Sequence, residues 1–334
     1  MILGDRLNDL HPKARPRWAP IGLAILLAFG ATALMLASRR APPSLALNIG
    51  DQRGAVHSLL KAAGELDHVP YRIEWDTFPV GAPLVEAIKD GAVDFGYVGA
   101  STVTFGLASG APLKVINVWR IHGPGSGLLV PASSPIHGLA DLRGKRIAVV
   151  RGSPGHLLVA EALQQAGVPL SAVTIVNLSA GDAKAALTSG AVDAWAIWDP
   201  YLAIGQFQDH DRVLITANQL APEVECGVAS DQAIQSKHAQ LLDFIGRVRR
   251  AWQWGQAHPD TVARAYAVDT GVPLDLARIV RGRMRVEALS QITDQAIADH
   301  QHDADVYAAI GLIPHPIQVA QVYDRSFVIL DADH

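Results

Sequence analysis

Two stretches of this chain share one pattern: Ala87-Ile-Lys-Asp-Gly-Ala-Val-Asp94 followed by Phe95-Gly-Tyr-Val-Gly-Ala-Ser101, and Ala186-Leu-Thr-Ser-Gly-Ala-Val-Asp193 followed by Ala194-Trp-Ala-Ile-Trp-Asp-Pro200. Each contains the end of an amphipathic helix, a glycine suited to a left-handed helix stop, a short apolar strand, and small or capping residues that can begin another helix. The pattern therefore predicts the same strand-to-helix connection twice.

The elements that precede each copy also repeat. A strand, an apolar-periodic helix and a second strand are expected at residues 45–50, 54–66 and 71–75, and again at 146–150, 154–167 and 173–177. A duplicated βαβαβ unit predicts an α/β fold with two similar lobes. Because ligands of such sheets bind beyond the carboxyl ends of the strands, we expect a cleft between the lobes, lined by the residues that follow each strand.

The order of elements predicts the domain boundaries. We expect a first lobe at residues 45–131, a second lobe at 132–226, and a return to the first lobe at 227–334. Pro131-Ala-Ser-Ser-Pro135 is the expected first crossing, and the apolar strand Glu225-Cys-Gly-Val-Ala-Ser230 is the expected way back. From Asp231 onward the pattern is helical, and these C-terminal helices are expected to pack on the first lobe.

Composition narrows the class of protein. The chain has 334 residues, enough for two domains of ordinary size, and a net charge of -4 with no basic block, so nucleic acid is a poor candidate partner. A single cysteine, Cys226, excludes an intramolecular disulfide and a multi-cysteine metal site. Asp299-His-Gln-His-Asp303 is expected to carry charge on a solvated helix face, and no metal or cofactor is predicted.

Residues 1–40 have the features of an export signal. Lys13, Arg15 and Arg17 precede an uncharged run over residues 18–38, which small residues and prolines follow after two arginines. This predicts a location outside the cytoplasm. The run is also long enough to span a membrane, so an uncleaved anchor is the alternative to a cleaved signal. No cysteine follows the run, which excludes a lipoprotein anchor.

The first lobe supplies two groups of candidate ligand contacts. Gln52 and Arg53 place hydrogen-bond donors after the first strand, and Gly54 leaves space beside them; as an alternative, both side chains are solvated turn residues. The run Gly99-Ala100-Ser101 follows the next strand, where small residues let backbone N–H groups approach an anion at a helix N-terminus. The alternative for Ser101 is a helix cap.

Further candidates follow other strands. Arg120 ends a strand and is a possible anion contact; the glycines after it do not form a nucleotide loop, because no Lys-Ser/Thr pair follows and the next element is a strand. Ser153 before Pro154 is a strong helix start facing the cleft. Trp198 is expected either to contact the apolar part of a ligand or to lie in the core. Asp199 is expected either to cap the next helix or to bind an amine.

Several of these stretches carry a family likeness. Gly190-Ala-Val-Asp-Ala-Trp-Ala-Ile-Trp-Asp-Pro-Tyr-Leu-Ala203 is the most specific, and residues 91–99, 139–146, 151–153 and 311–316 add to it. Together they resemble the aliphatic-sulfonate-binding proteins of bacterial ABC importers, whose near relatives bind nitrate or taurine. The likeness covers roughly residues 45–319.

The resemblance implies a type II periplasmic-binding-protein fold that closes on a small anion and delivers it to a membrane permease driven by a cytoplasmic ATPase. It implies a periplasmic receptor, expected to be a monomer and not an enzyme. Carried onto this sequence, the sulfonate-binding positions are Gln52, Gly54, 99–101 and Ser153, with Trp198 and Asp199 beside the substituent.

Other functions stay open at this point. Taurine, nitrate or another small organic anion is the alternative ligand, and a membrane-anchored sensory binding domain is the alternative role. An enzyme on the same fold would resemble thiamin-pyrimidine synthases, which the export signal and the single cysteine disfavour. Many relatives have Asp-Ala where this chain has Ala100-Ser101. The resemblance therefore predicts the anionic head of the ligand better than its organic part.

Overall fold

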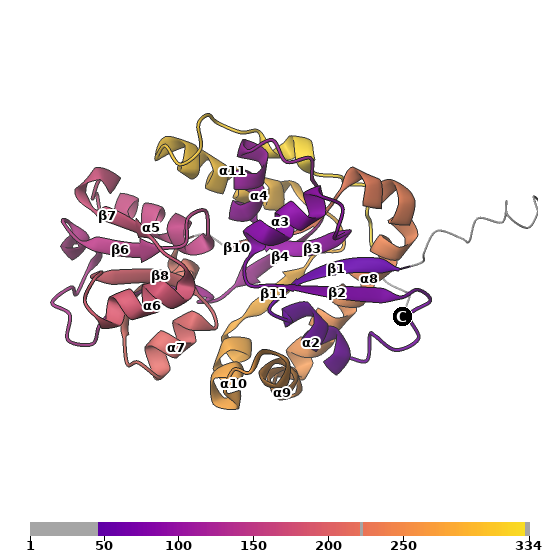
Figure 1. The fold of residues 1–334 in the computed structure, drawn as a ribbon, viewed down its shortest axis with the longest axis horizontal. Coiled ribbons are helices and arrows are strands. Elements are labelled where there is room, and N and C mark those ends of the chain that lie inside the picture. Colours follow the sequence, from indigo (N-terminus) through magenta and orange to yellow (C-terminus); the bar gives the residue numbers. More distant parts are fainter. Residues whose placement is uncertain (1–45, 221–222, 331–334) are drawn as a thin grey trace, which may run out of the picture. The chain divides into compact units, whose positions relative to one another are not determined.

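The computed structural model describes residues 46–220 and 223–330, so the predicted signal or anchor lies outside the described residues. Within those ranges the chain forms two mixed β-sheets with helices around them (Figure 1). No helix of the described part combines the length and the hydrophobicity needed to cross a membrane. The predicted α/β class with two βα sheets is confirmed.

The first sheet has the strand order β11-β4-β10-β3-β1-β2. Its strands are β1 (Leu47–Gln52), β2 (Ile73–Phe78), β3 (Phe95–Gly99), β4 (Lys114–His122), β10 (Glu223–Ala229) and β11 (Arg285–Ala288). The second sheet has the order β7-β6-β8-β5-β9. Its strands are β5 (Ser126–Val130), β6 (Arg146–Val149), β7 (Thr174–Asn177), β8 (Ala194–Trp198) and β9 (Arg212–Thr216).

The helices lie between and after these strands. They are α2 (Ala55–Ala62), α3 (Gly81–Lys89), α4 (Ala100–Ala108), α5 (Pro154–Gln165), α6 (Ala180–Thr188), α7 (Tyr201–Phe207), α8 (Asp231–Ala257), α9 (Pro259–Thr270), α10 (Leu274–Arg283) and α11 (Asp294–Ala309). Short 3₁₀ turns are η1 (Leu139–Leu142), η2 (Leu170–Ala172), η3 (Ala217–Gln219) and η4 (Val319–Val322).

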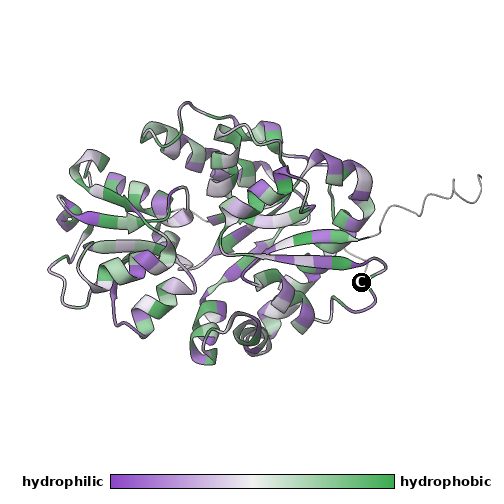
Figure 2. Cartoon of the chain, in the orientation of Figure 1, coloured by the Kyte–Doolittle hydropathy of each residue, from purple (hydrophilic) through white to green (hydrophobic). Residues whose placement is uncertain are grey.

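Helices bury both faces of each sheet. On the first sheet, α2 and α8 cover one face around Phe95 and Phe244, while α3 and α4 cover the other around Val98 and Leu84. On the second sheet, α5 lies on one face and α6 with α7 on the other, where Trp195 is fully buried. The strands accordingly carry many hydrophobic residues, whereas the helices alternate between hydrophobic and hydrophilic residues (Figure 2).

The repeated Gly-Ala-Val-Asp sequence performs the same structural role in both lobes. Asp94 accepts the N–H of Asn48 at 2.7 Å, and Asp193 accepts the N–H of Arg146 at 2.8 Å. The N–H of Asp94 in turn donates to the carbonyl of Asn48, and that of Asp193 to the carbonyl of Arg146, at 2.8 Å in both cases. The aspartate of each copy therefore holds the N-terminal part of the first strand of its βαβαβ unit, which is β1 in the first lobe and β6 in the second.

Strand pairing corrects both predicted boundaries between the lobes. The crossing to the second lobe comes before β5, not at residues 131–135, because β5 pairs with β8 and β9. The return comes before β10, because the whole of Glu223–Ala229 pairs with β3 and β4. Short apolar strands carry no local signal that specifies their sheet, which is why the predicted limits 131/132 and 226/227 are wrong.

The C-terminal region contains one strand that the helical pattern did not predict. β11 pairs with β4 at the edge of the first sheet. Helices α8 and α9 pack on α2 as expected, while α10 and α11 also contact α7 and α5 of the second lobe. The C-terminal helices thus lie on the first lobe and reach across to the second.

Helix α5 begins where Ser153 and Pro154 predicted it. Ser153 Oγ accepts the N–H of His156 at 3.3 Å, and proline occupies the first turn. Gly155 follows, and a β-carbon built on it would lie 2.8 Å from the carbonyl oxygen of Ala196. The absence of a side chain at Gly155 therefore seats the start of α5 directly against β8.

A Gly155→Ala variant should lower the free energy of unfolding by about 1–3 kcal/mol, because backbone atoms have to move to admit the methyl group. Gly181 has the same position in α6, and nothing lies within 4 Å of its β-carbon position. Gly181→Ala is the matched control and should be neutral or stabilising by up to about 1 kcal/mol. Urea unfolding of both variants measures the difference, and equal stabilities would contradict the constraint.

Candidate functional site

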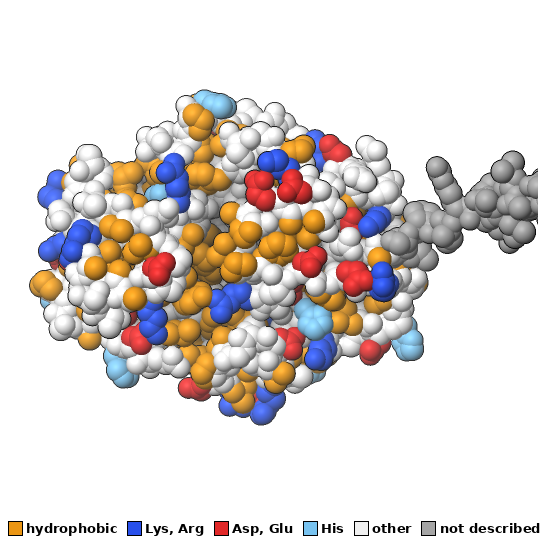
Figure 3. Space-filling view, in the orientation of Figure 1, with side chains coloured by type: hydrophobic (Ala, Val, Ile, Leu, Met, Phe, Trp, Pro, Cys, Tyr) orange, Lys and Arg blue, Asp and Glu red, His pale blue; other side chains and the backbone are white. Residues whose placement is uncertain are grey.

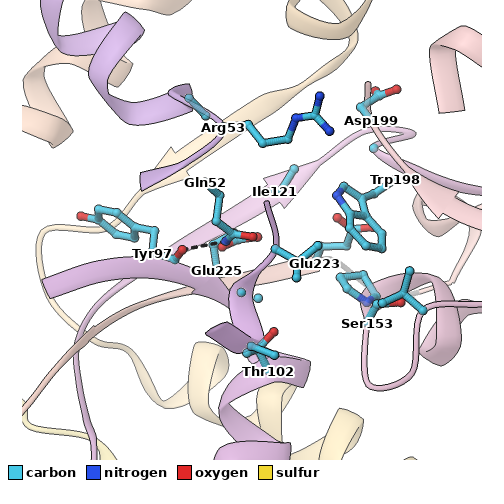
Figure 4. Close-up of a pocket in the computed structure, with 18 of the residues that line it drawn as sticks. Gln52, Arg53, Tyr97, Thr102, Ile121, Ser153, Trp198, Asp199, Glu223 and Glu225 are labelled. Atoms are coloured by element: carbon cyan, nitrogen blue, oxygen red, sulfur yellow. Dashed lines mark hydrogen bonds between the residues drawn. The ribbon is translucent and has the colours of Figure 1, made fainter. Parts of the chain in front are cut away.

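A cavity of about 450 Å³ lies between the two sheets. Residues after β1 and β3 and residues on β4 and β10 form its wall on the first lobe, while the starts of α5 and α7 and the end of β8 form its wall on the second. Figure 3 shows a hollow on this face of the molecule, bordered largely by hydrophobic side chains, and Figure 4 shows the residues around the cavity. The expected cleft at the carboxyl ends of the strands is present.

Six of the predicted contact residues lie in the cavity wall: Gln52, Arg53, Gly99, Ser153, Trp198 and Asp199. Gln52 Nε2 donates to the carbonyl of Tyr97 at 2.8 Å, which fixes its amide at the cavity surface (Figure 4). Ser153 caps α5 and is buried. Contact between these residues and a ligand stays a prediction.

Two side chains join the lobes at one side of the cavity. Arg53, with a left-handed φ of 56°, donates from its guanidinium to the Tyr201 hydroxyl and lies 5.0 Å from the centroid of that ring. The Asp199 carboxylate accepts hydrogen bonds from both Nε and Nη2 of Arg283, with the Nε contact at 2.7 Å. Arg53 and Arg283 therefore both tie the first lobe to residues at the start of α7.

Asp199 is a cap and an ion-pair partner. Its Oδ1 accepts the N–H of Ala203 at 3.1 Å in the first turn of α7. Burial raises the pKa of this carboxyl, and the Arg283 guanidinium opposes that shift. Since Arg283 occupies it, Asp199 has little capacity left to bind an amine.

Three predicted residues on the first lobe lie away from the cavity. Gly54 has a φ of 74° and faces Asp269 of α9, so it serves the backbone turn. Ala100 and Ser101 line a separate cavity of about 30 Å³. The Tyr307 hydroxyl lies 2.9 Å from Ser101 Oγ and 3.0 Å from the carbonyl of Ser153, so Ser101 takes part in a link between α4 and α5.

Arg120 is also outside the cavity. Trp119 and Ile121 of β4 line it, and strand alternation turns Arg120 to the opposite face of the sheet. There its guanidinium pairs with Asp299 at 2.9 Å and with Glu287 at 3.3 Å. The prediction was wrong because β4 continues to His122, so Arg120 is not at the end of the strand, and its side chain points away from the cavity.

Arg281 is a cavity residue that the sequence did not reveal. It lies on α10, is 9% exposed, and its Nε and Nη2 atoms are buried without a hydrogen-bond partner among the described residues. The guanidinium lies 5.1 Å from the Trp252 ring and 5.0 Å from the Tyr266 ring. Burial lowers the pKa of Arg281, while Tyr266 and Asp51 oppose the shift.

The carboxylate of Asp51 affects the pKa of Arg281 through its charge, but its hydrogen bonds go to other groups. Asp51 accepts the N–H groups of Val56 at 3.1 Å and His57 at 2.8 Å, at the start of α2. Burial raises the pKa of Asp51 to about 6, against the effect of these two hydrogen bonds. Asp51 therefore takes the free N–H groups of α2 that could otherwise have met a ligand, and no hydrogen bond joins it to Arg281 in the described part of the chain.

Aromatic rings form much of the remaining wall. Tyr97 and Trp119 stack at a centroid distance of 3.7 Å, and Trp119 meets Trp252 edge-on at 5.3 Å. Trp198 lies on the opposite lobe beside Ser153 (Figure 4). These rings offer an apolar surface to a carbon chain and a π face to a cation.

Two glutamates of β10 also line the cavity. Glu223 and Glu225 are two residues apart and share one face of the strand. Burial raises the pKa of Glu223 to about 7 and that of Glu225 to about 8, with Asp199 adding to the first shift and Glu223 to the second. The sequence prediction assigned this strand to a crossing and so missed both carboxyl groups.

The residues of Asp299-His-Gln-His-Asp303 have separate partners, and no group in the described part of the chain could hold a metal ion. His302 contacts Glu161 at 3.0 Å, and His300 is buried against Thr104 and Tyr323. Asp303 is buried as well, and burial raises its pKa well above the usual range. The expectation of a wholly solvated face is wrong for these two positions.

The fold and the cavity define a two-lobed solute-binding protein of the periplasmic-binding-protein class. The sequence profile of the NMT1/THI5-like family matches residues 80–262, and the chain belongs to that family. It is 28% identical over 279 residues to an aliphatic sulfonates-binding protein of Escherichia coli K12, covering 83% of this chain and 88% of the relative. It is 32% identical over 264 residues to a binding protein of Brucella abortus, covering 74% and 78%.

Solved structures agree with this class. The alkanesulfonate-binding protein SsuA of Xanthomonas axonopodis, bound to MOPS, superposes with a TM-score of 0.76 at 28% identity, covering 86% of this chain and all of that one. The desulfurization enzyme DszB shares only the fold, with a TM-score of 0.60 at 17% identity. The relatives with the higher identities are binding proteins.

Proposed function

We propose that this chain is the extracytoplasmic solute-binding component of an ABC importer and that its ligand is a small organic sulfonate. The observation that carries this proposal is Arg281, a buried guanidinium in the wall of an aromatic-lined cavity, two of whose nitrogens have no hydrogen-bond partner in the described part of the chain. A buried charge without a partner is costly. An anion in the cavity supplies the missing partner.

The chemistry of a sulfonate matches the site. It is permanently ionised, it has three acceptor oxygens, and a guanidinium pairs well with such a group. The Ser153 hydroxyl and the Gln52 amide are further polar groups in the cavity wall, one on each lobe, and Trp119 with Trp198 would cover the carbon chain. Binding and release need no proton transfer, so we propose a receptor and not an enzyme.

The names of the relatives support the cellular role. Proteins of this kind act outside the cytoplasm, so we propose a periplasmic location, with residues 1–40 as signal or anchor, and an inner-membrane permease with a cytoplasmic ATPase as partners. A monomer is proposed because one chain provides both walls of the cavity.

Calorimetric titration of the purified full-length chain in mild detergent tests this function. The panel is butanesulfonate, an aromatic sulfonate, sulfate and nitrate. We expect saturable binding of an organosulfonate, and weaker or undetectable heats with sulfate and nitrate, because neither of them fills the aromatic part of the cavity. Preference for sulfate or nitrate would contradict the proposed ligand class.

A further inference from the structure

Glu223 and Glu225 place two carboxyl groups side by side in a cavity whose proposed ligand is an anion. Glu223 Oε2 lies 3.6 Å from the β-carbon position of Gly125, and Glu225 Oε1 lies 3.8 Å from that of Gly99. Glu223 Oε1 is buried and has no hydrogen-bond partner among the described residues. A ligand that carries only negative charge leaves this oxygen unsatisfied.

The cations among the described residues that line the cavity are Arg53, Arg151 and Arg281, and none of them forms an ion pair or hydrogen bond with Glu223 or Glu225. Asp199 is held by Arg283, and on the side of the smaller cavity the pair faces Asp303 of α11 and Glu161 of α5, which contacts His302. Ser126, the strand partner of Trp198, has a buried hydroxyl with no hydrogen-bond partner among the described residues. The neighbours are therefore carboxyl groups, a hydroxyl and an aromatic ring.

Arg281 occupies a different part of the cavity. It lies on α10 against the rings of Trp252 and Tyr266, whereas Glu223 and Glu225 lie on β10. Trp119 lies between the two, because it contacts Trp252 beside Arg281 and is the strand partner of Glu225. The cavity thus has a cationic region and an acidic region.

We propose, on the basis of the proposed function, that the ligand is a zwitterionic sulfonate whose sulfonate group meets Arg281 and whose ammonium group lies between Glu223 and Glu225. An ammonium has three N–H donors, which suits two adjacent carboxylates and satisfies Glu223 Oε1. The face of Trp198 adds attraction for the cation. The carboxyl pair then discriminates against sulfonates that lack an amine.

The test compares aminopropanesulfonate, with its amine on the terminal carbon, and butanesulfonate, which has a methyl group in the same place. In calorimetric titrations of the full-length chain at about pH 8, the amine ligand should bind about tenfold more tightly or better, as a charge-assisted hydrogen bond provides. The double variant Glu223→Gln/Glu225→Gln should abolish this preference without weakening butanesulfonate. Glu74→Gln, an exposed carboxylate on β2, is the control and should keep the preference.

The pH dependence provides a second readout. Because the free carboxyl groups have pKa values raised to about 7 and about 8, an ammonium has to bind their ionised forms, and its affinity should rise as pH increases through that range. Butanesulfonate should gain nothing over the same range.

The outcomes separate the two proposals. Equal affinities for the two ligands would overturn the zwitterion inference and leave the sulfonate receptor in place. The same holds if the affinity for butanesulfonate falls as pH rises while the affinity for aminopropanesulfonate does not increase. Failure of both ligands to bind would overturn the proposed function and the inference with it.

Discussion

Arg281→Met should weaken sulfonate binding about 100-fold or more. Removing one member of a buried charge pair costs roughly 2–5 kcal/mol of binding free energy, and each 1.4 kcal/mol is about a tenfold change. Methionine is flexible enough to keep the contacts with Trp252 and Tyr266. In the ligand-free protein the variant should be as stable as the original or more stable, because it removes an unpaired buried charge.

Titration with butanesulfonate and urea unfolding measure the two effects. Arg278→Met is the matched control on the same helix, because Arg278 is exposed and pairs with Asp260. It should leave the affinity unchanged. If Arg281→Met binds within twofold of the original protein while Arg53→Met loses binding, the anion site belongs to Arg53 instead.

Arg283→Met should lower the free energy of unfolding by about 3 kcal/mol at neutral pH, because Asp199, whose side chain is 3% exposed, loses its partner. Burial already raises the pKa of Asp199, and removal of Arg283 raises it further. A carboxyl with a raised pKa in the folded state contributes stability while protonated and loses it as pH rises through that pKa. The deficit should therefore be largest near pH 7 and smaller near about pH 4.

Urea unfolding at the two pH values is the measurement. The double variant Asp199→Asn/Arg283→Met should recover most of the loss, because no buried charge remains unpaired. The exposed pair of Arg278 and Asp260 is the comparison, where Arg278→Met should cost less than about 1 kcal/mol. A loss of similar size in both single variants would show that burial of the Asp199 pair has little importance.

Local rules predicted the part of the site that follows strands directly. Gln52, Gly99, Ser153 and Trp198 all lie at such ends, and the parallel βα units bring these ends to one edge. The repeated Gly-Ala-Val-Asp predicted two similar lobes, but the hydrogen bonds of Asp94 and Asp193 to the first strand depend on tertiary pairing. Arg120 was misplaced because the phase of a strand is not fixed by its end.

The unpredicted part of the site comes from distant segments. Arg281 reaches the cavity because α10 packs beside α9 and α7, and nothing in its local sequence distinguishes it from the exposed Arg278 of the same helix. Glu223 and Glu225 line the cavity because β10 is inserted between β3 and β4. Neither event leaves a periodic or motif signal near the residues concerned.

The insertion of β10 also determines the order in which the chain can be completed. The strands of the second sheet, β5 to β9, are contiguous in sequence, so that lobe needs nothing that follows Thr216 to pair its strands. The first sheet cannot close until β10 arrives, and until then β3 and β4 each present an unpaired edge of the kind that joins other strands. The later lobe in the sequence is therefore the first that can complete its sheet, and the earlier one keeps two open edges until β10 is in place.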